Sequence, residues 1–265
     1  MTLLQAFLLG VLQGATEFLP ISSSGHLVLL PWLLDWPAPG LAFDAVVHWG
    51  TALAVIAYFW RDWVNIVKST NLKSTNLKSK VWLILLGTLP AALIGYLLKD
   101  FFEGMFARPG AAAGFLLLTA AILAASEWFG HRERDLDTLA WPDALIIGLA
   151  QALAILPGIS RSGATIAAGL ARGLRREPAA RFSFLLATPI ILGAGLLQTM
   201  DLAQAGNLAA QAPTLIVGFL SAGLVGFVCI HFLMRYLQRH RLYPFAVYCA
   251  VAGFICLLVA LARGT

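Results

Sequence analysis

Six apolar runs, each about as long as a bilayer is thick, dominate this chain of 265 residues. A helix needs roughly 20 apolar residues to cross the hydrocarbon core. The runs cover residues 41–60, 81–98, 110–129, 179–200, 213–236 and 243–261. Only 12% of the residues are charged, whereas about a quarter are charged in a typical soluble domain. The sequence therefore predicts an all-α polytopic membrane protein with six spanning helices.

Four shorter apolar segments form two pairs, and a break rich in Pro, Ser and Gly joins the members of each pair. The pairs are 3–18 with 25–34, and 141–155 with 163–174. A broken helix at membrane depth is tolerated where its backbone lines a cavity. A pair that enters and leaves on one side of the membrane is a re-entrant hairpin. We therefore expect two re-entrant helical hairpins, over residues 3–36 and 141–175.

The two hairpins resemble each other when residue n is placed over residue n + 138. The identities are Gly10 with Gly148, Gln13 with Gln151, Ile21 with Ile159, Ser22 with Ser160, Ser24 with Ser162 and Gly25 with Gly163. Each half then holds one hairpin and three spans, and this odd number of spans inverts the second half, as in many transporters. We predict a single membrane domain over 1–265, an inverted-topology repeat whose first unit covers about 1–130 and second about 141–262.

Basic residues predict the orientation of the chain. Cytoplasmic loops of membrane proteins carry an excess of Lys and Arg. If the N-terminus lies outside, only Lys99, Arg108 and Arg263 of the 18 lysines and arginines fall on the outer side, while Arg161 lies within the protein. This bias also explains the formal charge of +5, so we expect no nucleic-acid partner.

Polar side chains gather at the breaks of the two hairpins. The first hairpin carries Gln13, Glu17, Ser22, Ser23, Ser24 and His26, and the second carries Ser160, Arg161, Ser162 and Thr165. An arginine is costly in hydrocarbon unless it faces a partner or a wet cavity. Because opposed hairpins of an inverted repeat meet near the midplane, these residues predict one anion site, and helix N-termini suit phosphate. Asp44 and His48 lie four residues apart at the start of a span, and we interpret them as interfacial rather than as residues that support the site.

Two motifs carry a resemblance to a known family over nearly the whole chain. They are Gln13-Gly-Ala-Thr-Glu17-Phe-Leu-Pro-Ile-Ser-Ser-Ser-Gly-His26 and Pro157-Gly-Ile-Ser-Arg-Ser-Gly-Ala-Thr165. The chain resembles the undecaprenyl-diphosphate phosphatases of the bacitracin-resistance type, many of which have glutamate in place of Gln13. The resemblance implies a multi-pass enzyme of the bacterial inner membrane whose active site faces the periplasm. It implies removal of one phosphate from undecaprenyl diphosphate, which recycles the carrier lipid for peptidoglycan synthesis and gives bacitracin resistance.

The resemblance also suggests roles. Glu17 with Gln13 would hold a divalent cation, Mg²⁺ or Ca²⁺, and Arg161 would act in catalysis and phosphate binding. Ser23 or His26 would attack phosphorus or activate a water, and serine, histidine and water stay open as nucleophile. The hydroxyls that would hold phosphate with Arg161 are Ser22, Ser24, Ser160, Ser162 and Thr165. The expected partners are a polyprenyl diphosphate lipid and the bilayer, and the sequence leaves a homodimer open.

An inverted-repeat transporter or flippase for an anionic phospholipid is the alternative, since broken helices recur in such proteins.

Overall fold

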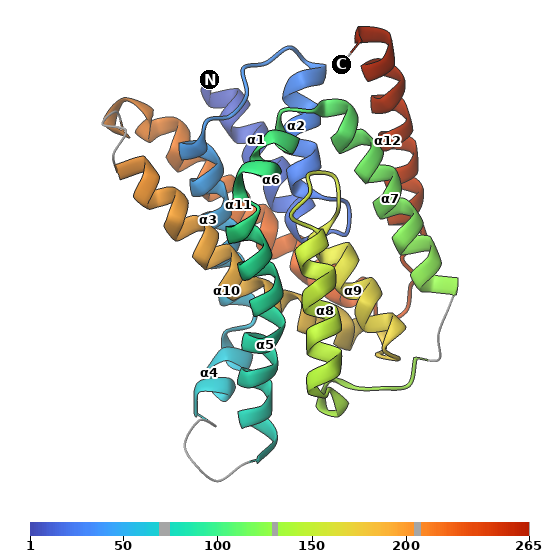
Figure 1. Cartoon of the computed structure of the whole chain (residues 1–265). Coiled ribbons are helices and arrows are strands. Elements are labelled where there is room, and N and C mark those ends of the chain that lie inside the picture. The colour runs from blue at the N-terminus through green and yellow to red at the C-terminus, as the bar shows by residue number, and fades with distance from the viewer. Residues whose placement is uncertain (69–74, 129–131, 204–207, 265) are drawn as a thin grey trace.

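The computed structural model describes residues 1–68, 75–128, 132–203 and 208–264, and in these ranges all regular structure is helical (Figure 1). The α-helices are α1 (Leu3–Phe18), α2 (Ser23–Leu33), α3 (Leu41–Tyr58), α4 (Trp60–Lys68), α5 (Thr75–Leu97), α6 (Lys99–Phe106), α7 (Pro109–Trp128), α8 (Trp141–Leu153), α9 (Arg161–Ala171), α10 (Arg176–Ala203), α11 (Leu208–Tyr236) and α12 (Tyr243–Arg263). A short 3-10 helix, η1 (Leu136–Thr138), precedes α8.

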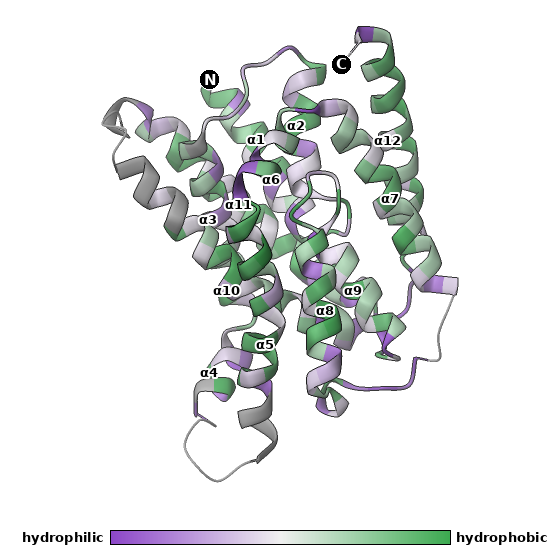
Figure 2. Ribbon diagram, viewed as in Figure 1, coloured by the Kyte–Doolittle hydropathy of each residue, from purple (hydrophilic) through white to green (hydrophobic). Residues whose placement is uncertain are grey.

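The long helices confirm the prediction of an all-α polytopic membrane protein. Within the described residues, five helices are long and apolar enough to cross a bilayer: α5, α7, α10, α11 and α12. A sixth span arises if α3 and α4, which meet at a bend of 72°, count as one. Figure 2 shows hydrophobic residues along these helices and hydrophilic residues toward the loops. Large apolar side chains on α11 and α12 face outward, as Leu224 and Val251 do, which suits contact with lipid.

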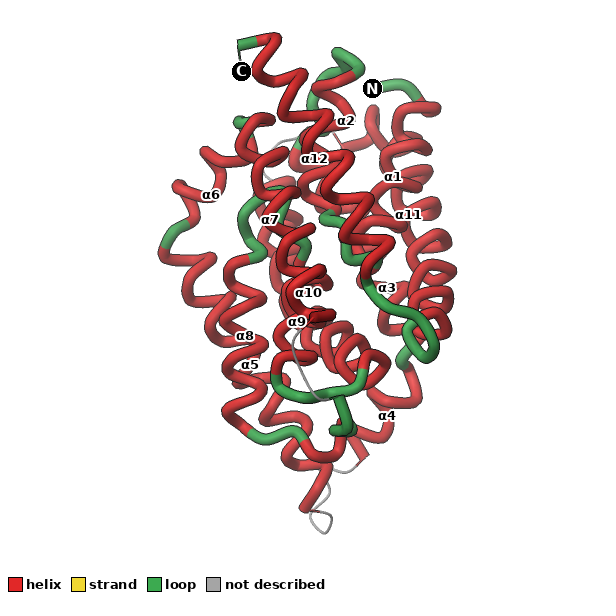
Figure 3. The backbone as a smooth tube through the Cα atoms, turned by 90° about the vertical axis from the view of Figure 1, so that its right-hand side faces the viewer, coloured by secondary structure: helices red, strands yellow, loops and turns green. Residues whose placement is uncertain are grey.

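Two helical hairpins enter the molecule from opposite ends. Figures 1 and 3 place the α1–α2 hairpin at the end where both termini lie, and the α8–α9 hairpin at the other end. Serine caps the second helix of each hairpin: the Ser22 hydroxyl accepts the Gly25 N–H at 3.3 Å, and the Ser160 hydroxyl accepts the Gly163 N–H at 3.1 Å. A serine in this position satisfies a backbone donor that the first helical turn leaves free. Ser22 and Ser160 are buried, so the breaks between the hairpin helices lie inside the protein.

Glycine pairs hold each hairpin close to a spanning helix of the other half. A Cβ added at Gly10 of α1 would lie 2.6 Å from the carbonyl oxygen of Gly218 in α11. One added at Gly148 of α8 would lie 2.3 Å from the carbonyl oxygen of Gly87 in α5. Small residues allow such close helix packing in membranes. Gly10 and Gly148 are the pair aligned by the 138-residue offset, so the matching contacts support the inverted repeat, whose boundaries stay a prediction.

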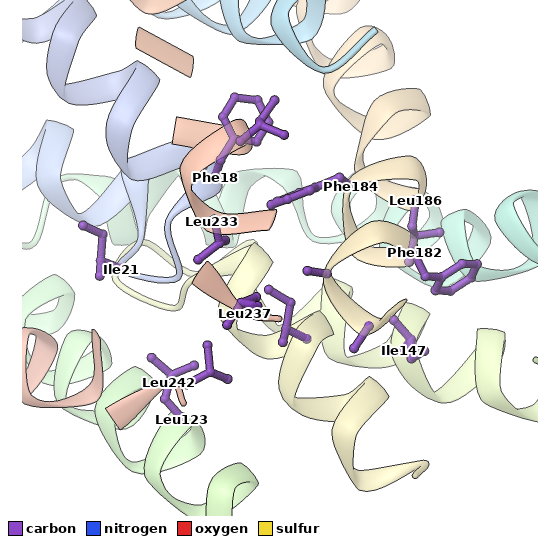
Figure 4. Packing of buried hydrophobic residues seen from close by; sticks show 14 of the residues in the cluster. Phe18, Ile21, Leu123, Ile147, Phe182, Phe184, Leu186, Leu233, Leu237 and Leu242 are labelled. Carbon is purple, nitrogen blue, oxygen red and sulfur yellow. The ribbon is translucent and has the colours of Figure 1, made fainter. Parts of the chain in front are cut away.

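The hydrophobic core anchors the hairpins to the spans (Figure 4). Phe18, the last residue of α1, packs edge-on against Phe184 of α10, with ring centroids 5.5 Å apart. Ile147 of α8 and Leu186 of α10 belong to the same buried cluster. Because both hairpins contribute to one core, the polar residues at their breaks are held in fixed positions.

Ion pairs tie the helices together at the end from which α8 enters. Glu127 of α7 accepts hydrogen bonds from Arg132 at 2.8 Å and Arg176 at 2.6 Å. Asp143, in the first turn of α8, pairs with Arg134 and Arg172, each at 2.7 Å. These contacts neutralise buried carboxylates and connect α7, α8 and α10 through the basic loops.

Candidate active site

A cavity of about 240 Å³ lies between the two hairpins. It is far larger than the roughly 30 Å³ that one water occupies. Its polar lining comes from Thr16, Glu17, Ser22, Ser23, Ser24, His48, Gln151, Ser160 and Arg161. Its apolar lining comes from Ala91, Phe106, Ala154, Ile155, Ile159, Ile190, Ile191 and Ala194. A polar head group with an apolar tail fits such a mixed lining.

An ion pair across the cavity joins the two hairpins. Arg161 Nη2 lies 2.7 Å from Glu17 Oε1, and the two side chains are only 13% and 6% exposed. Removing one partner of a buried ion pair leaves an uncompensated charge, so the two residues depend on each other. Arg161 Nη1 is buried and has no hydrogen-bond partner in the described part of the chain. The guanidinium therefore keeps a free donor for an anion.

Glu17 also accepts hydrogen bonds from its own hairpin. The Ser23 hydroxyl donates to Glu17 Oε2 at 2.6 Å, and Gln13 Nε2 donates to the same oxygen at 3.1 Å. The short contact from Ser23 is typical of a hydroxyl that donates to a carboxylate. Such a carboxylate is placed to take the hydroxyl proton. The structure thus brings the predicted residues Gln13, Glu17, Ser23 and Arg161 together.

Both ring nitrogens of His26 have partners other than Ser23. Its Nδ1 is 2.7 Å from the carbonyl oxygen of Ser22, and its Nε2 is 2.7 Å from the Tyr248 hydroxyl. The carbonyl can only accept, so Nδ1 carries a proton and donates to Ser22, while Nε2 forms its hydrogen bond with the Tyr248 hydroxyl. The Ser23 hydroxyl instead contacts Glu17. A catalytic role for His26 stays a prediction.

The remaining hydroxyls split into two groups. Ser22, Ser24 and Ser160 line the cavity. Ser162 donates to the carbonyl of Leu19 at 3.2 Å and so links the hairpins. The Thr165 hydroxyl lies 2.6 Å from that of Ser183 in α10, away from the cavity lining. Phosphate binding by Ser162 and Thr165 stays a prediction.

Three residues near the site were not assigned to it from the sequence. His48 of α3 lines the cavity, where the interfacial interpretation had not placed it. Thr119 of α7 donates to the carbonyl of Gly158 at 2.8 Å and accepts the Ser160 N–H at 3.0 Å, so it supports the loop before Arg161. Gln151 of α8 is buried against the cavity. Gln151 had a signal in the sequence, its alignment with Gln13, and His48 had one in its spacing from Asp44, whereas Thr119 had none.

The expected divalent cation can be tested against the donors present. Within the described residues, no group of three or more His, Cys, Asp or Glu is placed to hold a metal. The Glu17 carboxylate lines the cavity and accepts the hydrogen bonds described above, and Gln13 Oε1 is buried with no partner among the described residues. Mg²⁺ is often bound through one or two carboxylates, with substrate phosphates and waters completing its shell. These oxygen donors fit a cation held jointly with a phosphate.

Comparison with known proteins assigns the family. A family model described as bacitracin resistance protein BacA matches residues 6–255. A Thermomicrobium roseum protein named undecaprenyl-diphosphatase is 45% identical, with 98% of both chains covered. A protein of the same name from Nitrosococcus oceani is 46% identical, and the alignment covers 92% of this chain and 94% of the relative. Another from Methanosphaera stadtmanae is 43% identical, and the alignment covers 97% of this chain and 98% of the relative. Both the model and these relatives extend over nearly the whole chain, which therefore belongs to the family of the bacitracin resistance protein BacA.

Proposed function

We propose that this chain hydrolyses undecaprenyl diphosphate to undecaprenyl phosphate and inorganic phosphate. The observation that carries the proposal is the buried Glu17–Arg161 pair, which joins the two hairpins at the cavity with the Ser23 hydroxyl 2.6 Å from Glu17. A guanidinium group, a carboxylate and a hydroxyl in one cavity suit phosphoryl transfer. The substrate follows from the name that the relatives share.

Phosphate binding rests on Arg161 and the helix ends beside it. Arg161 Nη1 is free to donate, and guanidinium donors bind phosphate oxygens strongly. The N-terminal ends of α2 and α9, capped by Ser22 and Ser160, add positive dipole ends. In the structure Glu17 neutralises Arg161. A bound diphosphate takes over that role and releases the carboxylate for chemistry.

Ser23 and Glu17 form the nucleophile and base that the geometry favours. The Ser23 oxygen attacks the terminal phosphorus while Glu17 accepts the hydroxyl proton. The bond from that phosphorus to the bridging oxygen breaks, and undecaprenyl phosphate leaves. Water then hydrolyses the phosphoserine, so that inorganic phosphate is released and Ser23 regains its proton.

A divalent cation, Mg²⁺ or Ca²⁺, completes the proposed site. Glu17 and Gln13 Oε1 are the residues that would hold it, and it would supply neutralisation of phosphate charge. Support comes from Gln13 Oε1, which has no partner among the described residues and belongs to the amide whose Nε2 contacts the Glu17 carboxylate.

The cavity wall also suits the lipid end of the substrate. Ile155, Ile159, Ile190 and Ile191 line the same space as Glu17 and Arg161. Apolar side chains there would contact the first isoprene units, so that the head group and the start of the tail bind together.

We place the protein in the bacterial inner membrane, with the cavity open to the periplasm. The distribution of Lys and Arg supports this orientation, since the end with the termini carries only Lys99, Arg108 and Arg263. In this location the reaction returns the carrier lipid to peptidoglycan synthesis, and the family description links it to bacitracin resistance.

Phosphate release by the purified protein tests the proposal. With undecaprenyl diphosphate in detergent, we expect phosphate release that a chelator abolishes, that added Mg²⁺ or Ca²⁺ restores and that Glu17→Gln lacks. Release that persists in chelator would contradict the cation. No release from well-folded wild type would favour the transporter or flippase instead, since a carrier breaks no bond.

A further inference from the structure

Gln151 is a buried amide that has no hydrogen-bond partner among the described residues. The residue is only 2% exposed, and neither Nε2 nor Oε1 has a hydrogen bond. It lies near the end of α8, two residues before the helix stops, and lines the cavity that holds Glu17 and Arg161. Leaving a buried donor and acceptor unpaired costs free energy. An amide retained under this cost at a ligand cavity is explained by a partner that arrives with the ligand.

The other hairpin shows what an equivalent glutamine does when a partner is present. Gln13 aligns with Gln151 at the 138-residue offset. Gln13 Nε2 donates at 3.1 Å to Glu17, four residues further along the same helix. Four residues after Gln151 the chain has Ile155 instead, which offers no acceptor and also lines the cavity. In the first hairpin the glutamine amide has a hydrogen-bond partner on its own helix. In the second hairpin the amide is left to bond to a ligand in the cavity.

We propose that Gln151 binds the head group of the lipid diphosphate, with its Nε2 donating to a non-bridging phosphate oxygen. This inference rests on the proposed function, because the diphosphate is the ligand that brings acceptor oxygens into the cavity. A change in the side-chain torsions of Gln151 turns the amide from the wall toward the bound head group. As a neutral donor, Gln151 recognises phosphate oxygens without adding charge to the cavity, whereas Arg161 supplies the charge.

Gln151→Leu tests the inference, because leucine has a similar size but no hydrogen-bonding atoms. We expect kcat/KM for undecaprenyl diphosphate to fall by roughly 10-fold to 100-fold, the effect of losing a hydrogen bond to a charged group. Gln151→Glu, which places a negative charge against the phosphate, reduces it further. The melting temperature of Gln151→Leu stays the same or rises, because an unpaired buried amide is removed. Gln238→Leu, the same exchange at an exposed residue near the basic loops, serves as the matched control and keeps wild-type kinetics.

Binding without hydrolysis separates this inference from the proposed reaction. A polyprenyl methylenediphosphonate, which cannot be cleaved, is titrated into wild type and both Gln151 variants. We expect Kd to rise in Gln151→Leu by about the factor seen in kcat/KM. Weakened binding in that variant would support Gln151 even if wild type released no phosphate, in which case only the proposed hydrolysis fails. Unchanged Kd and kcat/KM in Gln151→Leu, or a lower melting temperature with wild-type kinetics, would overturn the inference and leave Gln151 a packing residue.

Discussion

Glu17 accepts three side-chain hydrogen bonds, from Arg161, Ser23 and Gln13. Each donor has a different function in the proposed reaction. Arg161 supplies charge, Ser23 supplies the nucleophile, and Gln13 orients the carboxylate. The Glu17 carboxylate therefore connects the side chains of both hairpins. In the proposed reaction, the substrate releases this carboxylate from Arg161, and it then acts as the base.

The ion pair between Glu17 and Arg161 gives a prediction about stability. Arg161→Met leaves the Glu17 charge buried and uncompensated, which costs about 3–5 kcal/mol. The double variant Glu17→Gln with Arg161→Met removes both charges and recovers most of this loss. Thermal unfolding in detergent measures both effects, and a double variant as unstable as the single one would contradict the coupling. Neither the single nor the double variant hydrolyses the substrate.

Ser23 gives a prediction about the chemical step. Ser23→Ala lowers kcat by at least about 100-fold, because the nucleophile and its proton transfer to Glu17 are lost. Quench of wild type during turnover with a denaturant at neutral pH, which preserves both phosphoserine and phosphohistidine, followed by peptide mapping, finds phosphate on Ser23. Phosphate on His26 would show that the histidine is the nucleophile.

The sequence identifies most polar residues of the site but not where all their side chains point. Arg161 and Glu17 stand out because charge is rare in apolar helices. The direction of His26 toward Tyr248 depends on α12, which lies more than 200 residues away in the chain. His48 lines the cavity because α3 packs against α10 and α11, and its neighbours in the sequence do not encode that packing. Gln151 could be aligned, but its lack of a partner required the structure.

At the scale of helices, close packing of the hairpins sets the geometry of the site. The apolar runs predicted the spans well because length and hydropathy decide which helices cross a bilayer. They missed α6 and the bend between α3 and α4. α6 is too short and polar to stand out as a run. α10 begins at Arg176, three residues before the predicted run, because its backbone hydrogen bonds extend into the polar residues that precede the apolar segment.

Gly148 gives a prediction about hairpin packing. A Cβ at this position meets the backbone of Gly87 at 2.3 Å, and backbone cannot move aside cheaply. Gly148→Ala therefore lowers the free energy of unfolding by about 1–3 kcal/mol, and it reduces kcat by shifting α8.

Gly114→Ala is the matched control for this test. A Cβ at Gly114 of α7 has no atom within 4 Å, and alanine favours a helix more than glycine does. Melting temperatures of the two variants are compared. Equal stability for Gly148→Ala and Gly114→Ala would show that the α5–α8 contact tolerates a side chain.

For the whole molecule, two hairpins that enter from opposite ends place one polar site inside an apolar protein. The 138-residue offset predicted this arrangement, and the matching glycine contacts of Gly10 and Gly148 support it. The sequence did not predict that a core shared by Phe18 and Phe184 would hold the hairpins in place, because such contacts arise only when distant helices pack.

Orientation in the membrane is tested by cysteine labelling. In a chain whose native cysteines are replaced by alanine, Glu103→Cys in α6 reacts with a membrane-impermeant maleimide added to spheroplasts. Glu133→Cys, in the basic loop before η1, reacts only after the membrane is permeabilised. Both positions are exposed. The reverse pattern would place the basic loops outside and contradict the periplasmic site.

The central claim is that Glu17 from one hairpin and Arg161 from the other build a single site that cleaves a lipid diphosphate. Phosphate release from undecaprenyl diphosphate by purified wild type and Arg161→Ala tests it most directly. We expect rapid phosphate release by wild type and a rate at least about 100-fold lower in Arg161→Ala, because a group that stabilises charge in the transition state is removed. Wild-type turnover by Arg161→Ala would contradict it.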